Sequence, residues 1–486
     1  MPTLEWIGKS KVINHHQEVP FRVLERKYSF DENGEHSEDN GSDNMIIRGD
    51  NLEALKALLP RYEGRVKCIY IDPPYNTGNE GWVYNDNVND PKIKKWLGEV
   101  VGKEGEDLTR HDKWLCMMYP RLKLLQKLLA DDGVIFISID DTECSNLILI
   151  CNEIFGASNF VANVSWQRTY SPRNDSKGIV SEVEHLVVFS KNPGWQPNKL
   201  PRTEAMDSRY KNPDNDVAPW KSSDAFAPGA ATHQGMVYAI QHPFTGEMLY
   251  PSNGRCWRYQ QSSMLEYMQG WCNYRLENLH DEKERARVCG IDESAVRKDV
   301  LAIVLEEPLE VSAAKAQKVY NRGRWPGFYF TKGGYGGIAR KTYLENVGGR
   351  LPTNLWMYEE TGHTDEAKKE LISLFGGRSP FDTPKPTRLL DFVLKVAGTS
   401  ETLMLDSFAG SGTTAHAVLN ANKADNGNRH FILIEMMDYA DSITAERVKR
   451  VIRGYGEGKN AVEGTGGNFS FYDLGEPLLM GDCLNE

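Results

Sequence analysis

Short apolar runs that end beside an acidic residue recur along this chain, and they constrain its fold more than any other feature. The four clearest runs cover residues 66–71, 134–139, 403–405 and 431–434. Runs of this length that are almost entirely apolar are typical of parallel strands that are buried on both faces. Segments with helical spacing of apolar residues lie between them, over 51–59, 114–130, 147–155, 389–397 and from 413 onward. This alternation predicts an α/β fold with a doubly wound, mostly parallel, Rossmann-like sheet.

A different texture begins near residue 191 and continues to about residue 350. Proline, glycine, tryptophan and tyrosine become frequent there and periodicity is poor, which indicates an inserted irregular domain that is large enough to fold as a unit. The polar, acidic stretch 31–41 is predicted to be a mobile arm or loop. The predicted domains are therefore an N-terminal arm over 1–44, one half of the core over 45–190, the inserted region over 191–350, and the second half of the core over 351–486.

The sequence Asp72-Pro73-Pro74-Tyr75 directly follows the first apolar run. The exocyclic amine of a nucleobase is a poor nucleophile, because its lone pair is delocalised into the ring. A carboxylate and an adjacent backbone carbonyl, held rigidly by two prolines, can accept hydrogen bonds from its protons and polarise it. We assign these roles to Asp72 and to the carbonyl of Pro73, and we expect Tyr75 to stack on a base flipped out of a duplex. The alternative is a strand-end turn in which Asp72 caps a helix.

A glycine turn, Phe408-Ala409-Gly410-Ser411-Gly412-Thr413-Thr414, follows the strand that ends at Asp406. Two glycines separated by one residue allow a tight turn and the close approach of a nucleotide-like ligand. Glu435 ends the next strand, where an acidic side chain can bind both hydroxyls of a ribose. Asp50, at the end of another strand, is a candidate for the adenine or amino-acid end of the cofactor. Helix capping is the alternative for Glu435 and Asp50. The predicted cofactor residues of these segments are Asp50, Asp406, Phe408, Ala409, Gly410, Ser411, Gly412, Thr413, Thr414 and Glu435.

The two motifs together predict methyl transfer from S-adenosylmethionine to an exocyclic amine, in one displacement and with no metal required. A metal site at His15, His16 and Glu18 is disfavoured, because adjacent histidines near a terminus usually face solvent. The scattered cysteines lack zinc-ligand spacing and fit the reduced thiols of a cytosolic protein. No apolar run approaches the roughly 20 residues of a membrane helix, and no signal peptide is recognisable, so no membrane partner is expected.

The net charge of −11 does not favour a nucleic-acid partner, but most of the acidic excess lies within 31–50 and 471–486. The segment 311–350 is instead basic and aromatic. Its predicted DNA contacts are Arg322, Arg324, Lys332, Arg340 and Lys341, and a solvated charged face is the alternative. Trp257, Trp325 and Trp356 fit core positions better than DNA contacts.

The chain resembles the β-group of amino-methyltransferases that act on DNA, in which the Asp-Pro-Pro-Tyr motif precedes the glycine motif. It is most similar to the modification subunits of type III restriction–modification systems. Besides the two motifs, the similar stretches are 46–55, 133–141, 212–216, 254–258, 362–370 and Thr383-Pro384-Lys385-Pro386. The resemblance implies a class I S-adenosylmethionine-dependent methyltransferase sheet, circularly ordered with the base-binding half first. It also implies that Lys385 and Pro386 close over the cofactor.

The resemblance further implies a site-specific, bacterial or archaeal, cytoplasmic enzyme that methylates double-stranded DNA. Aspartate rather than serine at position 72 favours adenine N6 over cytosine N4, and residues 191–350 are expected to read the DNA sequence. A homodimer is expected, and a restriction subunit is a candidate partner. A stand-alone enzyme fits equally well, because the chain is shorter than such subunits. The open alternatives are methylation of cytosine N4, of RNA or of a protein glutamine amide, and a regulator with an inactive site.

Overall fold

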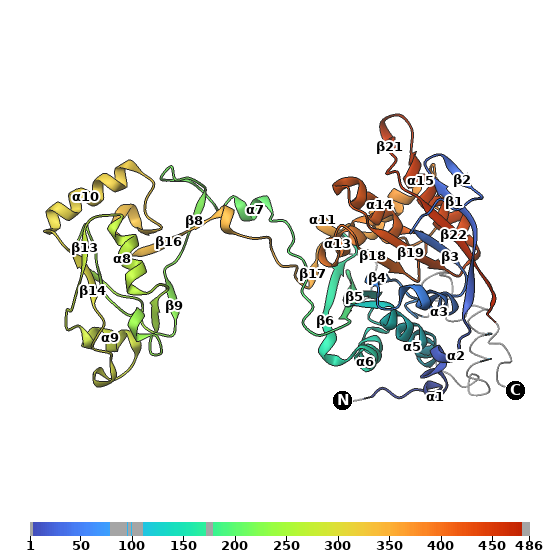
Figure 1. Ribbon diagram of the computed structural model, residues 1–486, viewed down its shortest axis with the longest axis horizontal. Coiled ribbons are helices and arrows are strands. Elements are labelled where there is room, and N and C mark those ends of the chain that lie inside the picture. The colour runs from blue at the N-terminus through green and yellow to red at the C-terminus, as the bar shows by residue number, and fades with distance from the viewer. Residues whose placement is uncertain (1–2, 78–94, 96–98, 100–109, 172–177, 479–486) are drawn as a thin grey trace. The chain divides into compact units, whose positions relative to one another are not determined.

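The structure is a computed structural model that describes residues 3–77, 95, 99, 110–171 and 178–478. The acidic C-terminal residues 479–486 therefore lie outside the described part. The chain divides into two compact units, which are coloured along the sequence in Figure 1. The main unit comprises residues 1–200 and 351–486, and the inserted unit comprises residues 201–350.

The described residues of the main unit form one sheet of eleven strands in the order β17-β6-β7-β5-β4-β18-β19-β3-β22-β1-β2. The strands β5, β4, β18, β19, β3 and β22 are parallel to one another. The bounds are β1 Arg22–Asp31, β2 Gly34–His36, β3 Met45–Arg48, β4 Val66–Ile71, β5 Leu129–Ile139, β6 Phe160–Gln167, β7 Val183–Ser190, β17 Leu355–Trp356, β18 Leu403–Asp406, β19 His430–Glu435 and β22 Phe469–Pro477. A separate pair is formed by β20 (Gly454–Tyr455) and β21 (Val462–Glu463).

Helices cover both faces of this sheet (Figure 1). Alternate residues of one strand serve opposite faces: Ile69 and Ile71 pack toward α3, α5 and α6, whereas Cys68 and Tyr70 pack toward α13, α14 and α15. Burial on both faces explains the apolar runs, and the predicted doubly wound sheet is confirmed. The helices are α1 Lys9–Val12, α2 His15–Glu18, α3 Asn51–Tyr62, α5 Arg110–Leu128, α6 Cys144–Phe155, α11 Tyr358–Thr361, α12 Thr364–Leu374, α13 Thr387–Ala397, α14 Thr413–Asp425 and α15 Glu446–Arg453.

The N-terminal segment differs from the expected arm. Strand β1 pairs antiparallel with β22, and β22 pairs parallel with β3, so residues 22–31 and 469–477 extend the main sheet. Residues 31–36, predicted to be mobile, form the β1–β2 hairpin. The first six residues of β1 alternate exposed residues (Val23, Glu25 and Lys27) with partly buried ones, and four of the six are charged, as is common near a sheet edge. That charged composition concealed the strand in the sequence.

The inserted unit has small sheets around its own core. Its sheets have the orders β11-β10-β14-β13, β15-β16-β8 and β12-β9. Trp257 and Trp271 are fully buried in its core, and Trp325 packs at the edge of that core. The elements are α7 Glu204–Asp207, β8 Trp220–Asp224, β9 Phe226–Pro228, β10 Ile240–Gln241, β11 Met248–Leu249, β12 Arg255–Trp257, α8 Gln261–Gln269, β13 Tyr274–Glu277, α9 Glu282–Cys289, β14 Ala302–Leu305, α10 Leu309–Arg322, β15 Phe328–Phe330 and β16 Ile338–Tyr343.

None of the helices in the described residues is both long and apolar enough to span a bilayer. The seven cysteines of the described part are free thiols, and all are buried.

Candidate active site at the carboxyl ends of the central strands

Two adjacent strands bring the two sequence motifs together. Strands β4 and β18 are parallel neighbours, with Ile69 opposite Leu405, so Asp72 and Asp406 lie at the same edge of the sheet. The chain continues from β4 to β5 on one side and from β18 to β19 on the other. The strand order therefore reverses between β4 and β18, which is where open α/β sheets bind ligands.

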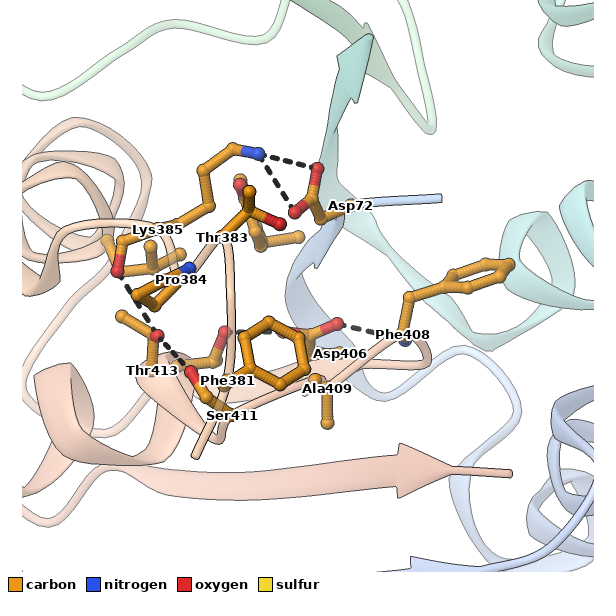
Figure 2. Close-up of a pocket in the computed structure, with 14 residues that line it drawn as sticks. Asp72, Phe381, Thr383, Pro384, Lys385, Asp406, Phe408, Ala409, Ser411 and Thr413 are labelled. Atoms are coloured by element: carbon orange, nitrogen blue, oxygen red, sulfur yellow. Dashed lines mark hydrogen bonds and ion pairs between the residues drawn. The ribbon is translucent and has the colours of Figure 1, made fainter. Parts of the chain in front are cut away.

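A pocket lies at this switch point, and Figure 2 shows the side chains that surround it. Its lining combines Asp72 with seven residues from Asp406 to Thr414 and with a segment around Lys385. The lining residues are Tyr70, Asp72, Phe381, Thr383, Pro384, Lys385, Leu390, Asp406, Phe408, Ala409, Gly410, Ser411, Thr413 and Thr414. Four predicted cofactor residues, Asp50, Pro386, Gly412 and Glu435, are not among these described lining residues. Tyr70, Phe381 and Leu390 were not predicted, because they form walls without a motif of their own.

Lys385 occupies the acceptor atoms of Asp72. Its Nζ donates to both carboxylate oxygens, at 2.8 Å and 2.9 Å, and to the Tyr75 hydroxyl at 2.8 Å. Burial raises the pKa of Asp72, and the ammonium only partly offsets that effect. Burial works against a charged lysine, but Asp72 and Glu184 outweigh it and raise the pKa of Lys385. The site therefore holds a protonated amine against a buried carboxylate.

Tyr75 is buried in this structure. Its side chain is only 4% exposed, and its hydroxyl lies 2.8 Å from Asp72 Oδ1 and 3.0 Å from Glu184 Oε2. The ammonium of Lys385 lies 5.1 Å from the ring centroid. The ring is therefore covered in this structure, and stacking on a base stays a prediction that requires it to be uncovered.

The backbone around Pro74 is anchored by residues outside the motif. Trp114 Nε1 donates to the carbonyl of Pro74 at 2.6 Å. Asn76, which directly follows the motif, has a φ of 60° and donates to the carboxylate of Glu143, which is fully buried. His111 also lies 2.6 Å from that carboxylate. These contacts fix the backbone that presents Asp72.

The glycine turn is closed by groups from the neighbouring segments. Glu435 Oε2 accepts the Gly410 N–H at 2.8 Å, and the Thr444 hydroxyl donates to the Gly410 carbonyl at 2.6 Å. Gly412 has a φ of +81°, and a Cβ there would lie 2.9 Å from the Thr444 carbonyl oxygen. Glycine is thus required at 412 for both conformation and space. In this structure Glu435 supports the turn.

Asp406 is a buried carboxylate beside the glycine turn. It accepts the Phe408 N–H at 3.0 Å and the Thr414 hydroxyl at 2.6 Å. Burial raises its pKa to about 7, an effect that these two hydrogen bonds oppose. Asp50 instead caps helix α3 through the Leu52 N–H at 2.8 Å and pairs with Arg121 at 3.2 Å. The capping alternative thus describes its contacts here.

A buried arginine, which was not predicted, supports the glycine turn through hydrogen bonds. Arg447 has no exposed surface and donates to the hydroxyls of Ser411 and Thr413, at 3.0 Å and 2.9 Å. Its other nitrogens contact Glu370 and His416. Burial and the arginine hold the pKa of His416 well below its usual value.

The predicted DNA-binding residues of the inserted unit fall into different environments. Arg322, Arg324 and Lys332 are exposed, and Arg340 is half-buried. Lys341 is different, because its buried ammonium binds Asp214, Asp216 and the carbonyl of Trp325. The prediction of Lys341 as a DNA contact is therefore corrected: an ammonium held by two carboxylates in a core cannot reach a phosphate. Among the described residues, no cluster of three or more histidine, cysteine or acidic side chains could hold a metal ion.

Residues 66–446, which include both motifs and most of the pocket, match a family model described as DNA methylase. The chain belongs to the DNA methylase family. Relatives of this chain include the Mod subunit of the type III restriction-modification enzyme StyLTI from Salmonella typhimurium (strain LT2), which is 32% identical over 85% of this chain and 58% of the relative. The EcoPI Mod subunit of Escherichia phage P1 is 30% identical over 89% of this chain and 63% of its own. The chain thus spans about six tenths of these two relatives.

The type II methyltransferase M.KpnI of Klebsiella pneumoniae is 27% identical over 84% of each chain. Among solved structures, the cytosine-N4-specific PvuII DNA methyltransferase aligns with 84% of this chain and 86% of its own chain, at 12% identity and a TM-score of 0.35. The complex of M1.HpyAVI with S-adenosylmethionine aligns with 83% and 98%, at 13% identity and a TM-score of 0.31. These scores are low, so the fold assignment rests on the sheet topology.

Proposed function

We propose that this DNA methylase transfers a methyl group from S-adenosylmethionine to the N6 amine of an adenine flipped out of double-stranded DNA. The observation that carries the proposal is the position of Asp72. Its carboxylate lines the same pocket as the glycine turn after Asp406, and both of its oxygens already accept hydrogen bonds from a nitrogen. A carboxylate that receives N–H donors beside a cofactor turn is suited to polarise an exocyclic amine.

The residues of the pocket fit the proposed cofactor. The glycine turn gives close backbone approach, and the pocket adds the acceptor carboxylate of Asp406 and the aromatic rings of Phe381 and Phe408. When bound, S-adenosylmethionine supplies an electrophilic methyl carbon on a positively charged sulfur. Aromatic rings and a carboxylate can both stabilise positive charge. Lys385 and Pro386 would close over the cofactor. Glu435 stays a predicted contact of its ribose hydroxyls, and Asp50 stays a predicted contact of its adenine or amino-acid end.

The chain's own groups prepare the amine. Asp72 and the carbonyl of Pro73 accept hydrogen bonds from its N–H groups, which draws the nitrogen toward a tetrahedral shape and frees its lone pair for attack. The methyl group would pass to this nitrogen in one displacement that releases S-adenosylhomocysteine, and the methylated amine would then lose one proton to water. Tyr75 stacks on the base after its ring is uncovered, where stacking contributes about 1–3 kcal/mol. Neither a covalent intermediate with the enzyme nor a metal ion is needed.

Adenine N6 is favoured over the alternatives by Asp72 at the first position of the motif. The short name of the matched family model, N6_N4_Mtase, covers both N6 and N4 methylation, so cytosine N4 is the second candidate. DNA is favoured over RNA because the matched relatives are named as restriction-modification subunits and type II methyltransferases. The inserted unit, with exposed Arg322, Arg324 and Lys332, is the proposed reader of the DNA sequence.

The cellular partners follow from the same relatives. Because StyLTI and EcoPI Mod are subunits of type III restriction-modification enzymes, a restriction subunit is a proposed partner of this chain, and a stand-alone methyltransferase is the alternative. A homodimer in a bacterial or archaeal cytoplasm is also proposed. Light scattering of the purified chain, with and without DNA, tests the dimer.

The product of the reaction tests the function. Purified protein is incubated with S-adenosylmethionine and either duplex DNA or RNA from a methylation-deficient bacterium, and the nucleosides are analysed by mass spectrometry. N6-methyl-2′-deoxyadenosine that is made by the wild type and not by Asp72→Ala supports the proposal. N4-methylcytosine or a methylated ribonucleoside would replace it with the corresponding alternative.

A further inference from the structure

Glu184 is a second buried carboxylate at the site, and neither motif contains it. Strand β7 runs antiparallel to β5, so its first residues lie at the edge where the parallel strands end. Glu184 is 6% exposed there. Its Oε2 lies 3.5 Å from Lys385 Nζ and 3.0 Å from the Tyr75 hydroxyl, and its Oε1 accepts from Arg168 at 3.0 Å. Burial would raise the pKa of Glu184, but Lys385 and Arg168 outweigh it and lower that pKa.

The proposed reaction requires Lys385 to leave Asp72. Its ammonium donates to both oxygens of that carboxylate, so the target amine and Lys385 compete for the same acceptors. A buried ammonium cannot leave its partner without another one, because an unpaired charge in a protein interior is costly. Glu184 is the other carboxylate within reach of Lys385 among the described residues.

The Tyr75 hydroxyl can keep both carboxylates hydrogen-bonded when Lys385 moves from Asp72 to Glu184. It has one proton, which it can give to Asp72 at 2.8 Å or to Glu184 at 3.0 Å. When Lys385 moves onto Glu184, this proton can turn to Asp72. Asp72 then accepts from Tyr75 and from the target amine, while Glu184 accepts from Lys385 and Arg168. Every buried polar group keeps a partner in both arrangements.

We propose that Glu184 is a positioning residue that receives Lys385 from Asp72 when the target amine enters the site. The inference rests on the proposed function and adds a residue to it. In Glu184→Gln the ammonium has only one carboxylate left and stays on Asp72, so the amine binds poorly. In Lys385→Met the competitor is gone, and Glu184 has nothing left to receive.

A double-mutant cycle tests this role. The variants are Glu184→Gln, Lys385→Met, their combination, and Glu184→Asp as the conservative form. The measurements are kcat, KM for an unmethylated duplex that contains the target sequence, and the Kd of S-adenosylmethionine by calorimetry. We expect Glu184→Gln to lower kcat/KM for DNA about 10- to 100-fold, the scale of one charged hydrogen bond, with cofactor affinity nearly unchanged. Glu184→Asp should recover part of the loss, and Glu184→Gln should add little to Lys385→Met.

Three outcomes overturn the inference. Glu184→Gln could have wild-type kinetics, it could lower kcat/KM as much in the Lys385→Met background as in the wild type, or it could lose S-adenosylmethionine binding. A structure of the wild-type protein with S-adenosylhomocysteine and target DNA tests it without mutation. Lys385 should then lie closer to Glu184 than to Asp72, and a lysine that stays on Asp72 contradicts the proposal. A wild-type protein that methylates no nucleic acid would instead refute the proposed function, so the two failures are distinguishable.

Discussion

The ammonium of Lys385 binds both carboxylate oxygens of Asp72, at 2.8 Å and 2.9 Å, and this buried pair joins the two halves of the site. Asp72 follows β4 in the first half of the core, whereas Lys385 precedes α13 in the second. The carbonyl of Lys385 also accepts the Thr413 hydroxyl at 3.2 Å, as Figure 2 shows. One residue therefore contacts the proposed catalytic carboxylate and the cofactor turn at once.

Replacing Asp72 should separate chemistry from cofactor binding. Asp72→Ala removes the acceptor of the target amine and should lower kcat at least about 100-fold, the scale of a lost transition-state hydrogen-bonding group. Calorimetry should show S-adenosylmethionine binding within a few-fold of the wild type. Asp141→Asn, a neighbouring surface aspartate that is 75% exposed, is the control and should have wild-type turnover. Normal turnover by Asp72→Ala would exclude the assigned role.

Filling the glycine turn should have the opposite effect. In Gly412→Ala the new Cβ would overlap the Thr444 carbonyl oxygen at a φ of +81°, whereas Gly64 has a φ of +68° and nothing within 4 Å of a Cβ. Both alanines carry the roughly 1 kcal/mol cost of a positive φ, but only Gly412→Ala displaces the turn. We expect weaker cofactor binding for Gly412→Ala and unchanged binding for Gly64→Ala. Equal affinities would show that the turn does not contact the cofactor.

Asp406 should make stability depend on pH. Its folded pKa of about 7 lies above the roughly 3.9 of an unfolded aspartate. The folded protein therefore holds a proton that the unfolded chain has lost, and the stability from this group falls as pH rises from 4 through 7. Between pH 5 and 8 the loss is about 3 kcal/mol, at about 1.4 kcal/mol per pKa unit. Urea unfolding of Asp406→Asn should lack this loss, and parallel pH profiles for both proteins would contradict the assignment.

Charge reversal in the inserted unit should weaken DNA binding. Arg322 and Arg324 are exposed, and their double replacement by glutamate should lower affinity for duplex DNA and reduce the slope against salt by about 1–2, as expected for lost phosphate contacts. Arg297→Glu is the matched control in the same unit, because Arg297 is exposed and paired with Asp299. Fluorescence anisotropy at several salt concentrations measures the effect. Equal losses in the control would indicate only a general charge effect.

Lys341 should behave as a structural residue. Lys341→Met leaves Asp214 and Asp216 without their buried cation, and breaking such a pair costs about 3–5 kcal/mol. We expect thermal unfolding of the inserted unit at a lower temperature, measured by calorimetry. A stable variant with weakened DNA affinity would restore Lys341 as a DNA contact.

The sequence was sufficient for the parts of the site that have local signatures. Apolar runs that end in Asp72, Asp406 and Glu435 predict strands, and their carboxyl ends must meet at one edge of a parallel sheet. Glu184 and Arg447 have no such signature. A single carboxylate at the start of a strand reaches the site only because β7 runs antiparallel, and a single arginine in an amphipathic helix does not reveal which face is buried. Both facts depend on tertiary pairing.

For strand β1 and for Lys341, local sequence led to predictions that the structure does not support. A charged strand beside the sheet edge has the composition of a loop, so the N-terminal arm was predicted where a strand exists. A basic residue in a basic, aromatic segment was assigned to the surface, but Asp214 and Asp216, more than a hundred residues earlier, bury it. Local composition does not report a partner that is distant in sequence.

Base-modification sequencing tests the central claim most directly. Genomic DNA is sequenced from a methylation-deficient bacterial host that expresses either the wild-type chain or Asp72→Ala. The account predicts N6-methyladenine at one recurrent sequence motif with the wild type, and none with the variant. The contrary result is an unmodified genome, although the protein purified from the same host is folded and binds S-adenosylmethionine. That result would contradict the claim that this chain alone methylates adenine in DNA.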